Sequence, residues 1–329
     1  MAAAPIYRVF PRFLVSIGIL LAAVAPGTAQ VWPPKTLRII VPFGPGSTPD
    51  IVARLVADGL AKKYPASTFL VENKPGASGN LGTDIVAKAV PDGATLGISI
   101  GGPLAINTLL FSKLPYDPSR DIAPITHLVT QPSALAVNLQ LKVNTVGELL
   151  ALLKVNPGKY NFASIGNGSL SHLAMQAIAL KAGATLVHVP YPSSPQAITA
   201  VIRGDAQIAC LPAISVTPQA TAGAVKILAV STARRSPYLP NVPTLKEAGI
   251  DVEADAWNGF IAPAGTPQEI IDAINRDVVA IVKSNDVRDK LAAQLMEPVG
   301  SSPQEFRSRI EREISHWAPV IKATNIKIN

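Results

Sequence analysis

Residues 37–60 read LRIIVPFGPGSTPDIVARLVADGL, and this stretch decides the fold class. Its first five residues, Leu37 to Val41, form an apolar run that predicts a buried strand. Apolar residues then recur at helical spacing from Asp50 to Lys63, which predicts a helix. Between them, Thr48 is a predicted N-cap and Pro49 the first helical residue. A strand that leads through a tight polar loop into a helix is the opening of an α/β unit.

The same alternation continues along the chain and defines two units. In the first unit, strands and helices alternate as βαβαβ, which favours a parallel sheet. A second unit begins near Ala134 and repeats the pattern. The sequence therefore predicts an α/β protein with two mainly parallel sheets flanked by helices. The further predicted elements are Phe69–Val71, Thr83–Ala89, Thr95–Ile100, Thr145–Val155, Tyr160–Ala163, Leu170–Ala182, Leu186–Val189, Pro195–Arg203, Ala206–Cys210 and Val225–Val230, with helix starts at Thr266 and Ser302.

The N-terminal segment is predicted to be a signal peptide covering residues 1–29. Arg8 and Arg12 precede an apolar run from Phe13 to Ala25, and small residues before Gln30 form a cleavage site. The run is shorter than the roughly 20 apolar residues that a membrane-spanning helix needs. An uncleaved membrane anchor is the alternative. The sequence thus predicts a periplasmic protein that is released after cleavage.

Composition excludes several function classes. The formal net charge is +7, two units of which belong to the predicted signal peptide, and the remaining basic residues are scattered, so no nucleic-acid surface is expected. Cys210 is the only cysteine, so the exported chain is held together by an apolar core, not by an intramolecular disulfide. The four histidines have no spacing typical of a metal site, and no catalytic or cofactor motif is complete. We expect no cofactor and a monomer.

Three polar, glycine-containing loops carry the candidate binding site. The first loop, after Val41, contains glycines and hydroxyl side chains and leads into the N-terminus of a predicted helix. The free amides and the dipole of that helix end favour binding of an anion. The others follow strands in the first and second units, and ligands of parallel α/β sheets lie beyond such strand ends. Because the loops contain no arginine, a carboxylate bound there would be held mainly by amides and hydroxyls. The candidate ligand-binding residues are Phe43, Gly44, Gly46, Ser47, Thr48, Asp50, Ser78, Gly79, Asn80, Ser164, Gly166, Asn167, Gly168 and Ser169.

These motifs, in this order, resemble the Bug-type (Bordetella uptake gene) receptors, the solute-binding components associated with tripartite tricarboxylate transporters. The matching stretches include IIVPFGPGSTPDIVARLVADGL at Ile39–Leu60, VENKPGASGNLGTDIVAKAVPDG at Val71–Gly93, FASIGNGSLSHLA at Phe162–Ala174, VPYPSSPQAITAVIRGDAQIA at Val189–Ala209 and WNGFIAPAGTP at Trp257–Pro267. The resemblance implies a two-lobed periplasmic binding protein of type II that closes like a Venus flytrap. It implies one lobe from residues 30–128 and 256–329 and another from 129–255, with crossing segments near His127–Ala134 and Glu253–Gly259.

The resemblance also implies a function without naming the ligand. It implies capture of a small organic acid or amino-acid-like solute between the lobes and delivery to integral membrane transporter subunits. Pro45-Gly46-Ser47 and Pro190–Pro195 depart from the family pattern, which leaves the solute open. A receptor that presents its solute to a membrane sensor is one alternative. A periplasmic hydrolase is another, with Ser169 or Ser47 as nucleophile and His172 as base.

Overall fold

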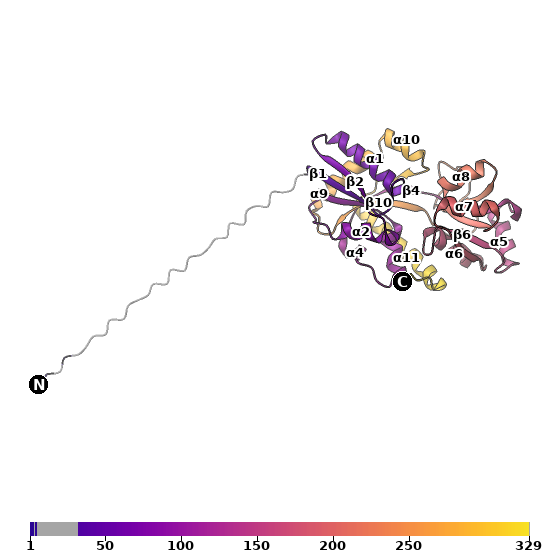
Figure 1. The fold of residues 1–329 in the computed structure, drawn as a ribbon, viewed down its shortest axis with the longest axis horizontal. Coiled ribbons are helices and arrows are strands. Elements are labelled where there is room, and N and C mark those ends of the chain that lie inside the picture. The colour runs from indigo at the N-terminus through magenta and orange to yellow at the C-terminus, as the bar shows by residue number, and fades with distance from the viewer. Residues whose placement is uncertain (3, 5–31, 329) are drawn as a thin grey trace. The chain divides into compact units, whose positions relative to one another are not determined.

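The structure, a computed structural model, describes residues 1, 2, 4 and 32–328. The predicted signal peptide and its cleavage site lie almost entirely outside the described residues. From Trp32 onward the chain forms two mixed sheets with helices on both faces, which Figure 1 shows as two groups of elements. We call the group around the sheet β11-β4-β10-β3-β1-β2 the first lobe and the group around β7-β6-β8-β5-β9 the second lobe.

The first lobe is built from two distant parts of the sequence. β1 pairs in parallel with β2 and β3, and β10 pairs antiparallel with both β3 and β4. Its elements are β1 (Thr36–Val41), α1 (Thr48–Lys63), β2 (Thr68–Asn73), η1 (Ala77–Gly79), α2 (Asn80–Ala87), β3 (Thr95–Ile100), η2 (Gly102–Ile106), α3 (Asn107–Leu110), α4 (Pro118–Asp121), β4 (Ile122–Gln131), β10 (Ala256–Pro263), α9 (Gln268–Val282), α10 (Asn285–Ala292), β11 (Glu297–Pro298) and α11 (Pro303–Thr324).

The second lobe is continuous in sequence. β6 pairs in parallel with β7 and β8, while β5 pairs antiparallel with β8 and β9. Its elements are β5 (Ser133–Asn138), η3 (Leu139–Leu141), α5 (Val146–Lys154), β6 (Asn161–Ser164), α6 (Leu170–Ala182), β7 (Val187–Pro190), α7 (Ser194–Arg203), β8 (Ile208–Pro212), α8 (Ala213–Thr221) and β9 (Val225–Val230).

The predicted α/β architecture with two lobes is confirmed, and the predicted strands and helices are present with small shifts at their ends. Only two of the five neighbouring strand pairs in the first sheet are parallel, however, and two of the four in the second. The prediction of mainly parallel sheets missed the pairing of β4, β5 and β10. These are the strands at which the chain leaves or enters a lobe, and they run antiparallel to their neighbours. Two helix starts also differ: Ser47, and not Thr48, occupies the N-cap position of α1, and α9 begins at Gln268 after Pro267.

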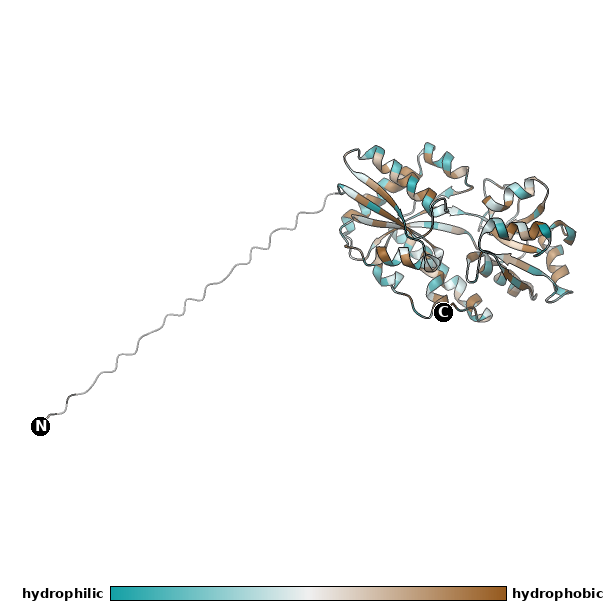
Figure 2. Cartoon of the chain, viewed as in Figure 1, coloured by the Kyte–Doolittle hydropathy of each residue, from teal (hydrophilic) through white to brown (hydrophobic). Residues whose placement is uncertain are grey.

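Each sheet is buried on both faces. Strand residues of β5 alternate, so that Leu135 and Val137 join one core with α6, while Ala134 and Ala136 join another with α7. In Figure 2 the hydrophobic segments are concentrated in the strands and the helix faces that cover them. No helix of residues 32–328 is long and apolar enough to cross a membrane.

The chain crosses between the lobes twice, and helix α11 contacts both of them. β4 ends at Gln131, and β5 of the other sheet begins at Ser133. After β9, the chain returns to the first sheet at Ala256, the first residue of β10. The C-terminal helix α11 packs against β4, yet its Trp317 and Ile321 belong to a core of the second lobe. The lobe boundaries expected from the sequence stay a prediction.

Candidate ligand-binding cleft

A cleft of about 510 Å³ lies between the two lobes. Its lining comes from the loops that follow β1 and β6, from η1 and η2, and from β10 and α11. Half of the sequence-predicted site residues line it: Phe43, Ser47, Thr48, Ser78, Asn167, Gly168 and Ser169. The first and third predicted loops therefore meet in space, although more than a hundred residues separate them in sequence.

The first loop presents a hydroxyl and a helix N-terminus to the cleft. Ser47 has extended backbone angles as the N-cap of α1, but its side chain makes no capping hydrogen bond. Its Oγ is buried and has no hydrogen-bond partner among the described residues. A buried unpaired hydroxyl costs free energy until a partner arrives, and the positive end of the helix dipole favours an anion as that partner. This wall suits a carboxylate.

Asp50 holds this loop in place and does not face the cleft. Its carboxylate accepts hydrogen bonds from the Gly46 amide at 2.9 Å, from Arg54 at 2.9 and 3.0 Å, and from Asn73 at 2.9 Å. Burial opposes the charged form, but these hydrogen bonds, led by that of Arg54, lower the pKa of Asp50. Asp50 is only 2% exposed and does not line the cleft, so its role is to position the loop. Gly44 and Gly46, in the same loop, do not line the cleft either.

Of the three residues predicted in the second loop, only Ser78 lines the cleft. Gly79 lies beneath the ring of Phe43, where an added Cβ would come within 2.9 Å of the ring. Asn80 is buried, and its Oδ1 accepts hydrogen bonds from Asn107 at 2.6 Å and Tyr116 at 3.1 Å. Gly79 and Asn80 therefore support the wall from behind.

The third loop begins α6 and is held by a cluster of polar side chains. The Ser169 hydroxyl donates to the Gly166 carbonyl at 2.7 Å and accepts from the His172 amide, so it caps α6. Ser164 does not line the cleft, because it lies beneath the loop and its Oγ is 2.6 Å from His188 Nε2. Gly166 is likewise outside the lining. Of the predicted residues in this loop, Asn167, Gly168 and Ser169 line the cleft.

The histidines His172 and His188 stabilise this loop in their neutral forms. Burial, with a smaller contribution from the nearby His188, lowers the pKa of His172 to about 4. Burial also lowers the pKa of His188. The Nδ1 of His172 accepts the Gly168 amide at 3.1 Å, which requires the unprotonated ring nitrogen.

The remaining wall, from β10 and α11, was missed by sequence reasoning. Asp255, Asn258 and Glu313 line the cleft and are each less than 10% exposed. Trp257 of β10 also lines the cleft. Other polar lining residues that the sequence did not reveal are Asn107, Gln131, Ser133, Ser171 and Ser194. The one available signal was the run Asp255-Ala256-Trp257-Asn258, where polar residues interrupt an apolar strand.

The geometry gives little support to the alternative of a hydrolase. Ser169 and His172 share a cap hydrogen bond through the histidine backbone, not through its ring. Ser47 has no hydrogen-bonded base. Within residues 32–328, no group of three or more His, Cys, Asp or Glu side chains could hold a metal ion. Cys210 is buried, and burial raises the pKa of its thiol to about 12.

A two-lobed α/β protein with helix N-termini at an interlobe cleft has the architecture of the periplasmic binding protein class. Comparison with known proteins identifies the family. Residues 52–326 match the family described as the tripartite tricarboxylate transporter family receptor, TctC, and the chain belongs to it. Protein BugT of Bordetella pertussis is 34% identical over 324 residues, covering 96% of this chain and 98% of that protein. The predicted membership of the Bug-type receptors is confirmed.

Solved structures agree with this assignment. The structure of R. palustris Rpa4515 with adipate matches at a TM-score of 0.79 and 33% identity, covering 90% of this chain and 99% of that chain. MatC from Rhodopseudomonas palustris, with bound malate, matches at a TM-score of 0.74 and 30% identity, covering 88% and 100%. The family and these neighbours are binding proteins, so the chain is a binding protein and not an enzyme.

Proposed function

We propose that this protein captures a small organic carboxylate in its interlobe cleft and delivers it to a tripartite tricarboxylate-type membrane transporter. The observation that carries the proposal is Ser47, whose buried, unpaired hydroxyl stands at the N-terminus of α1 on the wall of the cleft. An anion there would accept from the hydroxyl and lie at the positive end of the helix. The adipate and malate bound by two structural relatives support the same ligand class.

The ligand is proposed to close the two lobes. Ser47, Thr48 and Ser78 come from the first lobe, while Asn167 and Ser169 come from the second. A solute that contacts both sets favours the closed arrangement, because only there can it make all its contacts. The expected division into residues 30–128 with 256–329 and residues 129–255 is part of this proposal.

We further place the mature protein, as a monomer, in the periplasm after cleavage near Gln30. Support comes from the basic and apolar N-terminal segment and from the family's periplasmic receptors. Mass spectrometry of the protein purified from the periplasmic fraction should give an N-terminus at or near Gln30. An intact N-terminus in the membrane fraction would overturn this placement.

A carboxylate screen tests the binding itself. A ligand at 100 times its Kd stabilises the folded state by about 2.7 kcal/mol, which raises the melting temperature measurably. Ligands identified by thermal shift are then titrated by calorimetry and examined by small-angle scattering. We expect the radius of gyration to decrease at saturation. Binding without any decrease would contradict lobe closure, and an absence of binding by all carboxylates would contradict the proposed function.

A further inference from the structure

The charges that line the cleft are all negative. Among the cleft residues that the structure describes, only Asp255 and Glu313 carry a charge, and no Lys, Arg or His joins them. Both acids belong to the wall formed by β10 and α11, whereas the anion-binding loops follow β1 and β6. A ligand that spans the cleft therefore meets hydrogen-bond donors at one wall and carboxylates at another.

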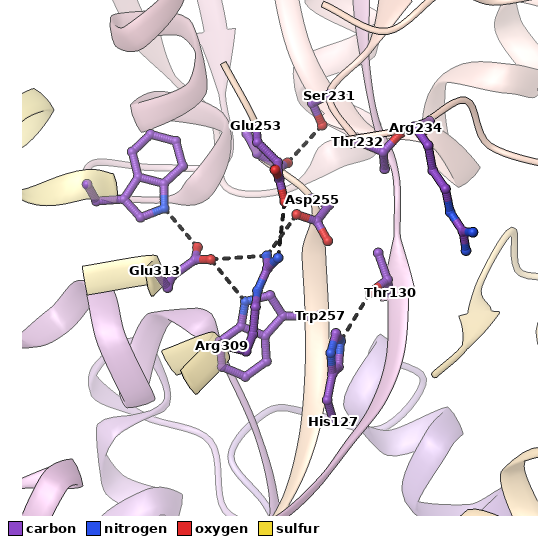
Figure 3. A network of polar contacts seen from close by, with 12 residues as sticks. His127, Thr130, Ser231, Thr232, Arg234, Glu253, Asp255, Trp257, Arg309 and Glu313 are labelled. Carbon is purple, nitrogen blue, oxygen red and sulfur yellow. Dashed lines mark hydrogen bonds and ion pairs between the residues drawn. The ribbon is translucent and has the colours of Figure 1, made fainter. Parts of the chain in front are cut away.

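The ion network around Asp255 is not electrically balanced. One guanidinium, that of Arg309, contacts Glu253 at 3.1 Å, Asp255 at 2.8 Å and Glu313 at 3.1 Å (Figure 3). The side chain of Glu253 is 43% exposed to solvent, but those of Asp255 and Glu313 are only 7% and 8% exposed. Two buried carboxylates thus share one partly buried cation, and buried charge without a partner is costly.

Asp255 also keeps one oxygen available. Glu313 is fully engaged: Oε1 accepts from Trp317 at 2.8 Å, and Oε2 accepts from Arg309 and Trp257. Asp255 accepts only from Arg309, through Oδ1, and no described residue donates to its Oδ2. This unpaired oxygen belongs to Asp255, which immediately precedes β10 and lines the cleft.

A second, independent group at this wall also lacks a donor. Asn258 lines the cleft and is 2% exposed, and its Oδ1 is buried with no hydrogen-bond partner among the described residues. Buried side-chain oxygens are almost always paired in folded proteins. Asn258 and Asp255 therefore share the same requirement for a hydrogen-bond donor.

We propose that the solute is a zwitterion, such as an amino acid, whose ammonium group binds at Asp255 and Asn258. This inference rests on the proposed binding of a carboxylate, which the loops of the other walls would hold. An ammonium group carries three donors and one positive charge, which satisfies both oxygens and balances the network. A second ionised carboxylate at the same place would face Asp255 and Glu313 without a counter-charge, so dicarboxylates are rejected.

Ligands with the same number of carbon atoms but different charged groups distinguish an effect of ligand charge from an effect of ligand size. The probes are hexanoate, adipate, 6-aminohexanoate and norleucine, with butyrate, succinate, 4-aminobutyrate and 2-aminobutyrate as a four-carbon series. Calorimetry on the purified mature protein near neutral pH should show that an amino acid binds about tenfold or more tightly than the diacid and the simple acid of its series. Equal or tighter binding of a diacid, or binding of simple acids alone, would overturn the inference and leave carboxylate capture intact.

Matched variants locate the ammonium site. Asp255→Asn keeps the size of the side chain and should weaken amino-acid binding about tenfold or more while leaving simple acids bound at least as tightly. Asp251→Asn makes the same charge change outside the cleft lining and should alter neither. If Asp255→Asn fails to fold, Asn258→Leu, which removes the other acceptor, should show the same loss for amino acids only. Unchanged selectivity in the folded variants would refute the assignment.

Discussion

The imidazole rings of His172 and His188 lie face to face, with centroids 3.8 Å apart and planes 8° apart. Phe162, which belongs to a hydrophobic core of the second lobe, stacks on His188 at a centroid distance of 4.9 Å. Two rings this close cannot both become charged without strong repulsion. The pair lies directly beneath the third binding loop, through Ser164 and Gly168.

This stack predicts a loss of stability in mild acid. Burial lowers the pKa of both histidines in the folded state, so the unfolded chain, with histidine pKa near 6.5, binds protons first. The stabilisation is therefore present above about pH 6.5 and is lost as pH falls from there towards about 4. We expect a loss on the order of 1 kcal/mol at about pH 5. His188→Gln, whose amide can still accept from Ser164, should flatten the dependence of melting temperature on pH in this range. An equal slope in variant and wild type would contradict the prediction.

Gly79→Ala should weaken ligand binding by displacing Phe43. Gly79 has a φ of +88°, and a Cβ there would lie 2.8 Å from Pro103 and 2.9 Å from the ring of Phe43. The positive φ alone costs an alanine about 1–2 kcal/mol. Gly158→Ala is the control, because Gly158 has a φ of +72° with no atom near the added Cβ. Both variants should lose stability in chemical denaturation, but only Gly79→Ala should lose affinity for a ligand found in the screen. Equal affinities in the two variants would show that Phe43 does not shape the cleft.

Ser169→Ala and Ser78→Ala should differ in stability while both weaken binding. The Ser169 hydroxyl caps α6, so its removal costs about 1 kcal/mol of folding free energy. Ser78 is exposed, and no hydrogen bond of its hydroxyl occurs among the described residues, so its removal should leave stability unchanged. A ligand carboxylate would accept the Ser78 proton directly, and the Ser169 proton in place of the Gly166 carbonyl, so affinity should fall in both variants, by about 1 kcal/mol or more for Ser78→Ala. Thermal denaturation and calorimetry measure the two effects. Full affinity in both variants would remove these serines from the site.

Arg309→Met should be among the most destabilising single substitutions in the chain. The substitution leaves the buried carboxylates of Asp255 and Glu313 without their cation. We therefore expect the free energy of unfolding to fall by about 3–5 kcal/mol. Burial already raises the pKa of Asp255 to about 6 in the wild type, against the opposing effect of Arg309. A raised carboxyl pKa means that stability is present at low pH and is lost as pH rises. The deficit of the variant should therefore shrink as the pH is lowered towards about 5.

The control for Arg309→Met is Arg312→Met. Arg312 is exposed on the same helix, and the substitution removes the same charge. Denaturant titrations at several pH values should show a small, pH-independent effect for Arg312→Met. If Arg309→Met also changes the free energy of unfolding only slightly, the negative charges of Asp255 and Glu313 do not depend on Arg309 for their stabilisation.

The sequence by itself determined the local elements and the chemistry of the loops. Strands such as β9 and helices such as α6 have the predicted bounds, because the periodicity of apolar residues and the capping residues act over a few neighbouring positions. Ser47, Thr48 and Ser169 were predicted for the same reason: strand-to-helix loops with glycine, serine and threonine are visible in a single stretch of chain. Which of the predicted loop residues line the cleft could not be predicted from the sequence. Asp50 and Asn80 are polar loop residues like Ser47, but in the structure they form hydrogen bonds with neighbouring residues, whereas the Ser47 hydroxyl has no partner among the described residues.

Only the tertiary structure decided the antiparallel halves of the sheets and the third wall of the cleft. β10 pairs with β3 and β4 across more than a hundred residues, and nothing within its own sequence specifies that pairing. In the same way, Asp255 acquires its environment from Arg309 and Glu313, which lie on a helix more than fifty residues away. Burial and charge balance are properties of groups brought together by folding. A single stretch of sequence shows which groups are present, but the three-dimensional packing determines which are left without a partner.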